Sequence, residues 1–204
     1  MSRAPTSGAP ISKGLLLVAM EPPAALEEEF NDWYDSEHFP QRRGLPGFES
    51  ASRWVCLSGW PRWLAIYDLS SVEALATPEY AAVSGGNSTP WSKRLLPRTI
   101  GRRRVVAEQL HPGDALALPA GEVARLCVAH YPGADDAAVE ALLQAAAGLD
   151  GLSQLRLFRD TTGALWLLAA FSHPVGLERI EGTFAVAGGY GAKLLNLYAP
   201  YRRD

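Results

Sequence analysis

The chain has 204 residues, of which 48% are hydrophobic and 20% charged, a balance typical of a globular protein with one large domain or two small ones. Its formal net charge of −3 argues against binding to nucleic acid through a basic surface. Cys56 and Cys127 lie far apart without a CxxC partner, which indicates buried free thiols. No apolar run is long enough for a membrane span or a signal peptide, so we expect a cytoplasmic protein.

The first half of the chain predicts the order strand, helix, strand, strand, helix, strand. A continuous apolar run over 14–20 is typical of a strand that is buried on both faces. The helix that follows contains residues 27–38, and we expect Pro40 to weaken it, because the residue before a proline disfavours the α conformation. The remaining elements are expected over 48–57, 62–69, 72–83 and 99–110, with a loop over 84–90.

The second half repeats this order. We expect a mobile leader over 1–13, a first repeat over 14–110, a linker over 111–121 and a second, degenerate repeat over 122–204. The elements of the second repeat are expected over 122–131, 137–147, 151–159, 164–171, 173–182 and 190–198.

Internal similarity supports this division. Trp54 corresponds to Phe158 at an offset of 104 residues (158 − 54), and Trp63-Leu64 corresponds to Trp166-Leu167 at an offset of 103 (166 − 63). Self-similarity at a nearly fixed offset is the signature of a duplicated unit. The order βαββαβ is that of the ferredoxin-like unit, so the predicted fold class is α+β, with two ferredoxin-like repeats.

The densest group of reactive side chains lies in the first predicted helix. Helical spacing places Phe30, Trp33 and Glu37 on one face, and Asn31, Tyr34 and His38 on an adjoining stripe. The second half has no counterpart of this segment, so a functional site is expected in the first half alone.

His38 is the candidate general acid or base, because an imidazole exchanges protons near neutral pH. Asn31 and Tyr34 share its stripe and are the other candidate catalytic residues, since either could orient the imidazole or a substrate. Candidate substrate-binding residues are Trp33, Glu37 and Arg53.

A structural interpretation of the same residues stays open. Glu37 could be a buried carboxylate that pairs with Arg42, Arg43 or Arg53, because a buried charge requires a partner. His38 could sit at the helix C-terminus only because a cation is favoured there.

The segment Asn31–His38, of sequence NDWYDSEH, is followed by Pro40 and by LPGF at 45–48. This pattern resembles the dimeric α/β-barrel superfamily, and most closely its EthD-like and related uncharacterised branches. Members include cofactor-free monooxygenases, dehydratases, lactone isomerases and haem enzymes, in which two ferredoxin-like units pack their sheets into a barrel. The resemblance implies that the two halves of this chain form such a barrel within one polypeptide, with a homodimer as a possible further assembly.

We therefore expect a cofactor-independent enzyme of isomerase, dehydratase or monooxygenase type that acts on a small apolar or aromatic compound. The alternative is a non-catalytic small-molecule binding or assembly protein of the same fold. No histidine or carboxylate spacing indicates a metal site. Because some relatives bind haem through a single histidine, the alternative cofactor is haem, with His130 or His38 as its ligand.

A basic run, Arg102-Arg103-Arg104, lies in the last strand of the first repeat. A solvated strand edge or a salt-bridged face is the more common explanation of such a run, and phosphate binding is the alternative.

Overall fold

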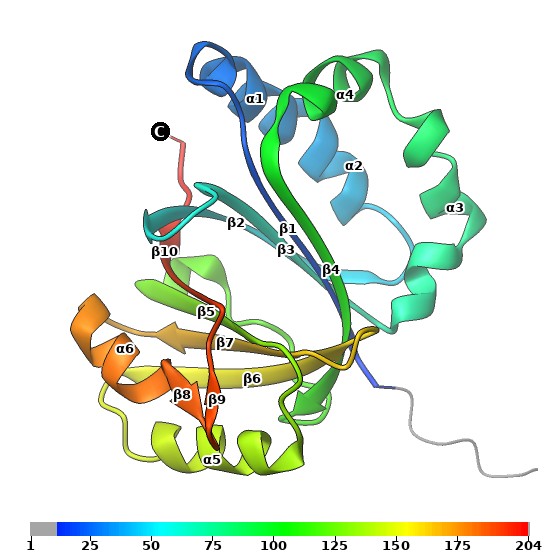
Figure 1. The fold of residues 1–204 in the computed structure, drawn as a ribbon. Coiled ribbons are helices and arrows are strands. Elements are labelled where there is room, and N and C mark those ends of the chain that lie inside the picture. Colours follow the sequence, from blue (N-terminus) through cyan, green and yellow to red (C-terminus); the bar gives the residue numbers. More distant parts are fainter. Residues whose placement is uncertain (1–11, 204) are drawn as a thin grey trace, which may run out of the picture.

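The computed structural model describes residues 12–203, so most of the leader expected over 1–13 lies outside the described residues. Two antiparallel sheets pack together, each with its helices on the outside (Figure 1). The three hydrophobic clusters follow this arrangement: one fills the space between the sheets, and one lies between each sheet and its helices.

The two sheets close into one barrel of eight strands. The strand order is β4–β1–β3–β2 in the first half and β6–β7–β5–β10 in the second, and the pairs β2–β10 and β4–β6 join the two. This confirms the predicted fold class, two ferredoxin-like βαββαβ units whose antiparallel sheets form an α/β barrel within one chain. The barrel strands are β1 (Gly14–Glu21), β2 (Phe48–Ser58), β3 (Trp63–Leu69), β4 (Ile100–His111), β5 (Arg125–Tyr131), β6 (Leu152–Asp160), β7 (Leu165–Phe171) and β10 (Leu194–Pro200).

Helices cover the outer face of each sheet (Figure 1). The first sheet carries α1 (Glu27–Trp33), α2 (Phe39–Arg43), α3 (Pro78–Ala81) and α4 (Pro90–Leu95), and the second carries α5 (Asp136–Ala146) and α6 (Leu177–Phe184). Short elements complete the chain: the 3-10 turns η1 (Ala24–Leu26), η3 (Val72–Ala76), η4 (Gly85–Asn87), η5 (Leu96–Arg98) and η6 (Ala120–Glu122), and the small strands β8 (Val186–Ala187) and β9 (Tyr190–Gly191).

The second helical region of the first half differs from its prediction. The single helix expected over 72–83 is divided at Thr77, whose side chain accepts a hydrogen bond from the backbone N–H of Tyr80 and so begins α3. Helix α4 was not predicted. Thr89 caps it in the same way and Pro90 occupies its first turn, where a proline needs no N–H partner.

The interior of the barrel is filled. Large side chains from both sheets meet there, among them Trp54, Phe158, Trp166 and Tyr198, all at most 3% exposed. The remaining cavity has a volume of only about 20 Å³, roughly the space of one water molecule. This cavity is too small to hold a substrate.

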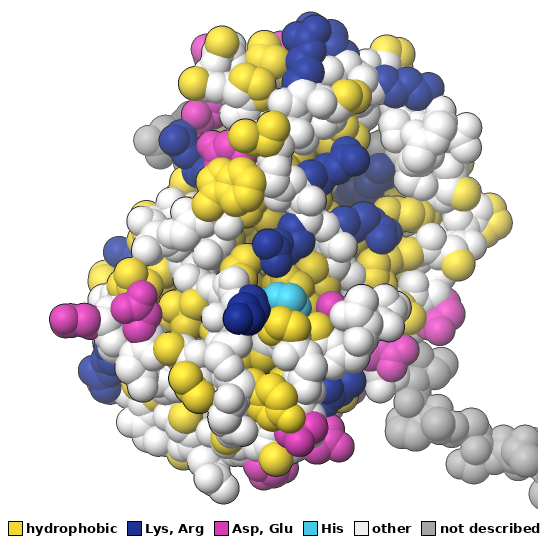
Figure 2. Space-filling view, viewed as in Figure 1, with side chains coloured by type: hydrophobic (Ala, Val, Ile, Leu, Met, Phe, Trp, Pro, Cys, Tyr) yellow, Lys and Arg dark blue, Asp and Glu magenta, His cyan; other side chains and the backbone are white. Residues whose placement is uncertain are grey.

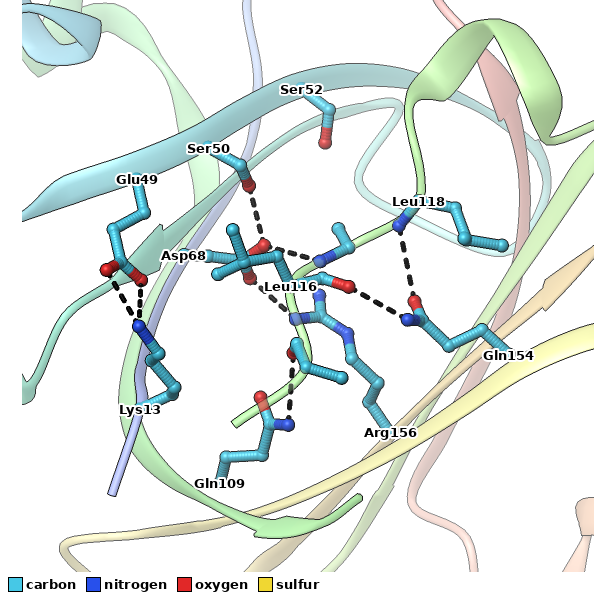
Figure 3. Close-up of polar contacts among 12 residues, drawn as sticks. Lys13, Glu49, Ser50, Ser52, Asp68, Gln109, Leu116, Leu118, Gln154 and Arg156 are labelled. Carbon is cyan, nitrogen blue, oxygen red and sulfur yellow. Dashed lines mark hydrogen bonds and ion pairs between the residues drawn. The ribbon is translucent and has the colours of Figure 1, made fainter. Parts of the chain in front are cut away.

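Polar side chains and a connecting segment close one end of the barrel (Figure 3). Asp68 of β3 accepts hydrogen bonds from Arg156 of β6 at 2.7 Å and from the backbone N–H of Ala117 at 2.7 Å. Gln154 pairs with the backbone of Leu116 and Leu118 in the same segment. The stretch that follows β4, expected as a linker over 111–121, is thus tied to both halves.

The strand registers correct the alignment of the two halves. Phe48 lies opposite Leu69 in the first hairpin, and Leu152 lies opposite Phe171 in the second. The offsets are 104 (152 − 48) and 102 (171 − 69), so the offset of 103 inferred for Trp63-Leu64 was wrong. The connection between β6 and β7 is two residues shorter than the one between β2 and β3. Trp166 therefore corresponds to Leu64, and both point into the barrel, whereas Trp63 faces the helices.

Candidate functional site

The continuous helical region over 27–43, called the motif helix below because it carries the NDWYDSEH segment, contains a π-helical turn, η2 (Tyr34–His38), between α1 and α2. The backbone N–H of Phe39 donates to the carbonyl of Tyr34, five residues earlier. A proline ring inside a regular helix collides with the carbonyl four residues before it, and the wider turn relieves that collision at Pro40. The helix therefore continues through Pro40 to Arg43, although the sequence predicts that it weakens at Pro40.

The π turn decides what surrounds His38. Its imidazole lies against the indole of Trp33, with ring centroids 4.3 Å apart, and meets the ring of Tyr34 edge-on at 5.2 Å. The two aromatic side chains are fully buried, so they hold the imidazole in one position. Regular helical spacing had placed Trp33 and His38 on different faces.

A cavity of about 290 Å³ opens beside His38, on the outer face of the first sheet. Its floor is formed by the outward side chains of β1, and its opposite wall by α2, α3 and the segment that joins α3 to α4. The apolar lining residues are Leu16, Val18, Met20 and Leu96. The volume is near the lower end of the range of about 300–1,000 Å³ for small-molecule sites.

Two residues that line the cavity, His38 and Tyr67, each have a buried polar atom without a hydrogen-bond partner among the described residues: Nδ1 of His38 and the hydroxyl of Tyr67. Burial, reinforced by the charges of Arg42 and Arg53, lowers the pKa of His38 to about 3, so its imidazole is neutral at pH 7. Burial raises the pKa of Tyr67 well above its usual value, so Tyr67 remains a phenol. The cavity wall thus presents a neutral imidazole and a phenolic donor.

Arg42 supplies a buried charge to the same cavity. Its side chain is 6% exposed, lies 5.3 Å from the ring of Tyr80 and donates to the carbonyl of Val83 at 2.8 Å. Within residues 12–203 no carboxylate forms an ion pair with it, and burial lowers its pKa.

The basic run of β4 contributes two further cations. Arg102 and Arg104 point to the outer face and line the cavity, and Arg104 donates to the hydroxyl of Tyr80 at 3.3 Å. Arg103, between them, points to the opposite face, with its guanidinium 6.0 Å from the ring of Trp166. In the described part of the chain, Arg102 and Arg104 form no salt bridge. A salt-bridged face therefore does not explain the basic run.

Two of the predicted residues form a separate network. Asn31 accepts a hydrogen bond from Arg53 at 2.7 Å, and Arg53 also pairs with Asp35. The Arg53 guanidinium lies between the rings of Tyr34 and Tyr201, at 4.4 and 4.2 Å from their centroids. Neither Asn31 nor Arg53 lines the cavity, and their contacts attach the motif helix to β2 and to the C-terminal segment.

The two other predicted residues contact α4. Trp33 donates from its indole nitrogen to Ser92 at 3.1 Å, and Glu37 accepts a hydrogen bond from Thr89 at 2.5 Å. Over the described residues Glu37 makes no ion pair with an arginine, so none of the three arginine partners considered for it is used. Of the predicted residues, only His38 lines the cavity. Tyr34 and Trp33 contact the imidazole of His38 but do not line the cavity.

The sequence pattern did not identify Tyr67 and Tyr80 as site residues. It considered Arg42 only as a partner of Glu37, and Arg102 and Arg104 only as part of a basic run for which phosphate binding was the alternative. One signal was available for the arginines. Residues two apart in a strand point to the same face, so Arg102 and Arg104 had to share a surface.

A haem does not fit the residues around His38. The cavity, with a volume of about 290 Å³, is small for a macrocycle of that size. His130 stacks on Trp166 in the filled barrel, with ring centroids 4.3 Å apart. The described residues contain no group of three His, Cys, Asp or Glu side chains suited to a metal ion, and no helix among them is long and apolar enough to cross a membrane.

Solved structures share the fold across nearly the whole chain. A candidate chlorite dismutase superposes with a TM-score of 0.62 at 8% identity, covering 94% of this chain and 96% of its own. An anthrone oxidase-like protein has a TM-score of 0.57 at 12% identity (94% and 92% covered), and a haem-binding protein from Thermus thermophilus has 0.52 at 10% (94% and 92%). No family model and no curated protein matches the sequence. At these identities the likeness shows the fold alone.

Proposed function

We propose that this protein is a cofactor-independent enzyme that moves a proton on a small, partly apolar compound bound in the cavity beside His38. The single observation that carries the proposal is that His38 and Tyr67 line one cavity, and that Nδ1 of His38 and the hydroxyl of Tyr67 have no hydrogen-bond partner among the described residues. Leaving such atoms without partners costs roughly 1–3 kcal/mol each. A substrate that hydrogen-bonds to both atoms would remove that cost.

The roles follow from the chemistry of each group. An isomerase, dehydratase or cofactor-free monooxygenase reaction that starts at an acidic C–H begins with removal of that proton, and neutral His38 would accept it. The Tyr67 phenol would donate a hydrogen bond to the oxygen on which negative charge develops, and Arg42 would stabilise that charge. Tyr34 and Trp33 would position the imidazole.

The remaining predicted residues have supporting roles in this proposal. Asn31 and Arg53 would fix the motif helix against β2, and Glu37 would fix α4 through Thr89. The names of two structural neighbours, the anthrone oxidase-like protein and a candidate monooxygenase from Fusobacterium nucleatum with a TM-score of 0.54 at 6% identity, agree with oxygenase-type chemistry.

The test is proton transfer itself. With an anthrone-type ketone in D₂O, the protein should accelerate exchange of the acidic C–H, followed by NMR, and oxygen uptake should be measured in parallel. His38→Gln should lower the exchange rate by roughly 10²- to 10⁴-fold, the usual contribution of a general base. The matched control is His173→Gln, a change at an exposed histidine outside the cavity.

Unchanged exchange in the His38→Gln protein would reject the proposal. A non-catalytic binding protein is the alternative, and the pKa of about 3 favours it, because so weak a base removes protons slowly. Membership of an EthD-like branch, an origin by tandem duplication, assembly into a homodimer and location in the cytoplasm stay predictions.

A further inference from the structure

The charge of the cavity wall indicates what the cavity binds. Three arginines line it, Arg42, Arg102 and Arg104, and the lining contains no Asp or Glu. Figure 2 shows Lys and Arg side chains gathered over the middle of this face, beside a hollow in which hydrophobic side chains are visible. A buried cation without a counter-ion is unfavourable, and Arg42 is such a cation among the described residues.

The floor of the cavity has the opposite character. Leu16, Val18 and Met20 point outward from β1, and Val18 lies directly opposite Arg104 in the β1–β4 ladder. The apolar floor on β1 and the cationic side chains of β4 are therefore adjacent in the pairing of these two strands. A ligand that satisfies both has an apolar body and one anionic group.

We propose that the cavity binds a small organic anion, a carboxylate or an enolate on an apolar or aromatic body. The anionic group lies against Arg42 and Arg104, accepts a hydrogen bond from Tyr67, and the body lies on the outer face of β1. This inference rests on the proposed function in that it names the ligand class of the same cavity.

Binding tests the inference directly. Sodium benzoate and the neutral benzamide, which have nearly the same shape, are titrated by calorimetry, and the melting temperature is followed in parallel. We expect benzoate to bind and to raise the melting temperature with concentration, and benzamide at least about tenfold more weakly, since charge-assisted hydrogen bonds are about twice as strong as neutral ones. Inorganic phosphate, which lacks the apolar body, should bind more weakly than benzoate.

Variants locate the site. Arg104→Gln should weaken benzoate binding by about 2- to 5-fold, as expected for an exposed charge. Arg42→Gln should weaken it by about 30-fold or more, as expected for a buried charge that loses its partner. Arg103→Gln is the matched control, because the same charge is removed one residue away on the opposite face of β4, and affinity should change less than about twofold.

Equal affinity for benzoate and benzamide, or equal effects of Arg103→Gln and Arg104→Gln, would overturn the inference. The two proposals fail separately. Benzoate binding that depends on Arg42, without any proton exchange that depends on His38, rejects the enzyme and keeps the anion site. Proton exchange on neutral compounds that depends on His38, without benzoate binding, keeps the enzyme and rejects the anion site.

Discussion

Two buried arginines of this molecule have opposite surroundings. Arg156, in the barrel, is 2% exposed and pairs with Asp68 at 2.7 Å. Arg42, outside the first sheet, is 6% exposed and has no carboxylate partner in the described residues. Two tyrosines repeat the contrast: Tyr131, under the helices of the second half, donates to the carbonyl of Phe184 at 2.5 Å, whereas Tyr67, under those of the first, has no partner.

Arg156 and Tyr131 bind other groups of the protein and so maintain the fold, whereas Arg42 and Tyr67 remain available to a ligand. Three buried side-chain atoms lack a partner within residues 12–203, and two of them belong to His38 and Tyr67, which line one cavity. The third is the indole nitrogen of Trp63. Partners are provided in the barrel and in the second half, so their absence beside His38 has no structural explanation and suits a bound molecule.

The largest expected effect tests the two arginines. Asp68→Ala should lower the free energy of unfolding by about 3–5 kcal/mol, because it leaves Arg156 charged and buried. Arg42→Met should lower it by only about 1–2 kcal/mol, because a hydrogen bond to the Val83 carbonyl is lost but no ion pair is broken. Urea denaturation at pH 7 measures both, and similar losses in the two variants would remove the distinction.

The two tyrosines provide the next test. Tyr131→Phe removes a buried hydrogen bond and should destabilise the protein by about 1–3 kcal/mol. Tyr67→Phe removes a hydroxyl that has no partner, so the stability should stay within about 0.5 kcal/mol of the wild type. A large loss in the Tyr67 variant would show that its hydroxyl contributes to the fold.

The smallest effect concerns pH. Burial lowers the pKa of His38 from 6.5 to about 3, so between these values the unfolded chain binds more protons than the folded one. Stability should therefore be complete above pH 6.5 and decline as the pH falls toward 3, with His38 accounting for on the order of 1–2 kcal/mol between pH 6.5 and 5. In His38→Gln this part of the decline should be absent when unfolding is measured at both pH values. An identical decline in both proteins would show that His38 is not buried as described.

The strands could be predicted from the sequence because each has a clear local pattern. The run at 14–20 is apolar throughout because β1 is covered on both faces, and Leu15 and Leu16 are both buried. The alignment of the hairpins could not be fixed in this way, because a loop that is two residues shorter leaves every local pattern intact. Only the pairing of Trp54 with Leu64 and of Phe158 with Trp166 reveals it.

Only the part of the site that lies on one helix could be predicted from the sequence. His38 was identified because reactive side chains cluster around it in sequence, but helical spacing assumes 3.6 residues per turn and fails at the π turn. Tyr67 and Arg104 reach the cavity from strands that only the folded sheet brings beside α2. Nothing in the sequence near Tyr67 indicates that its hydroxyl would be left without a partner.

The pairing of β2 with β10 and of β4 with β6 has a consequence for assembly. A barrel built from two separate identical chains opens on dilution and requires each chain to match a copy of itself. Here both seams form inside one polypeptide, where the connecting segment keeps the two sheets at an effective concentration on the order of millimolar. Barrel closure is therefore independent of protein concentration. The second sheet also need not have the same sequence or shape as the first, so it can support the barrel while the first sheet carries the proposed binding cavity.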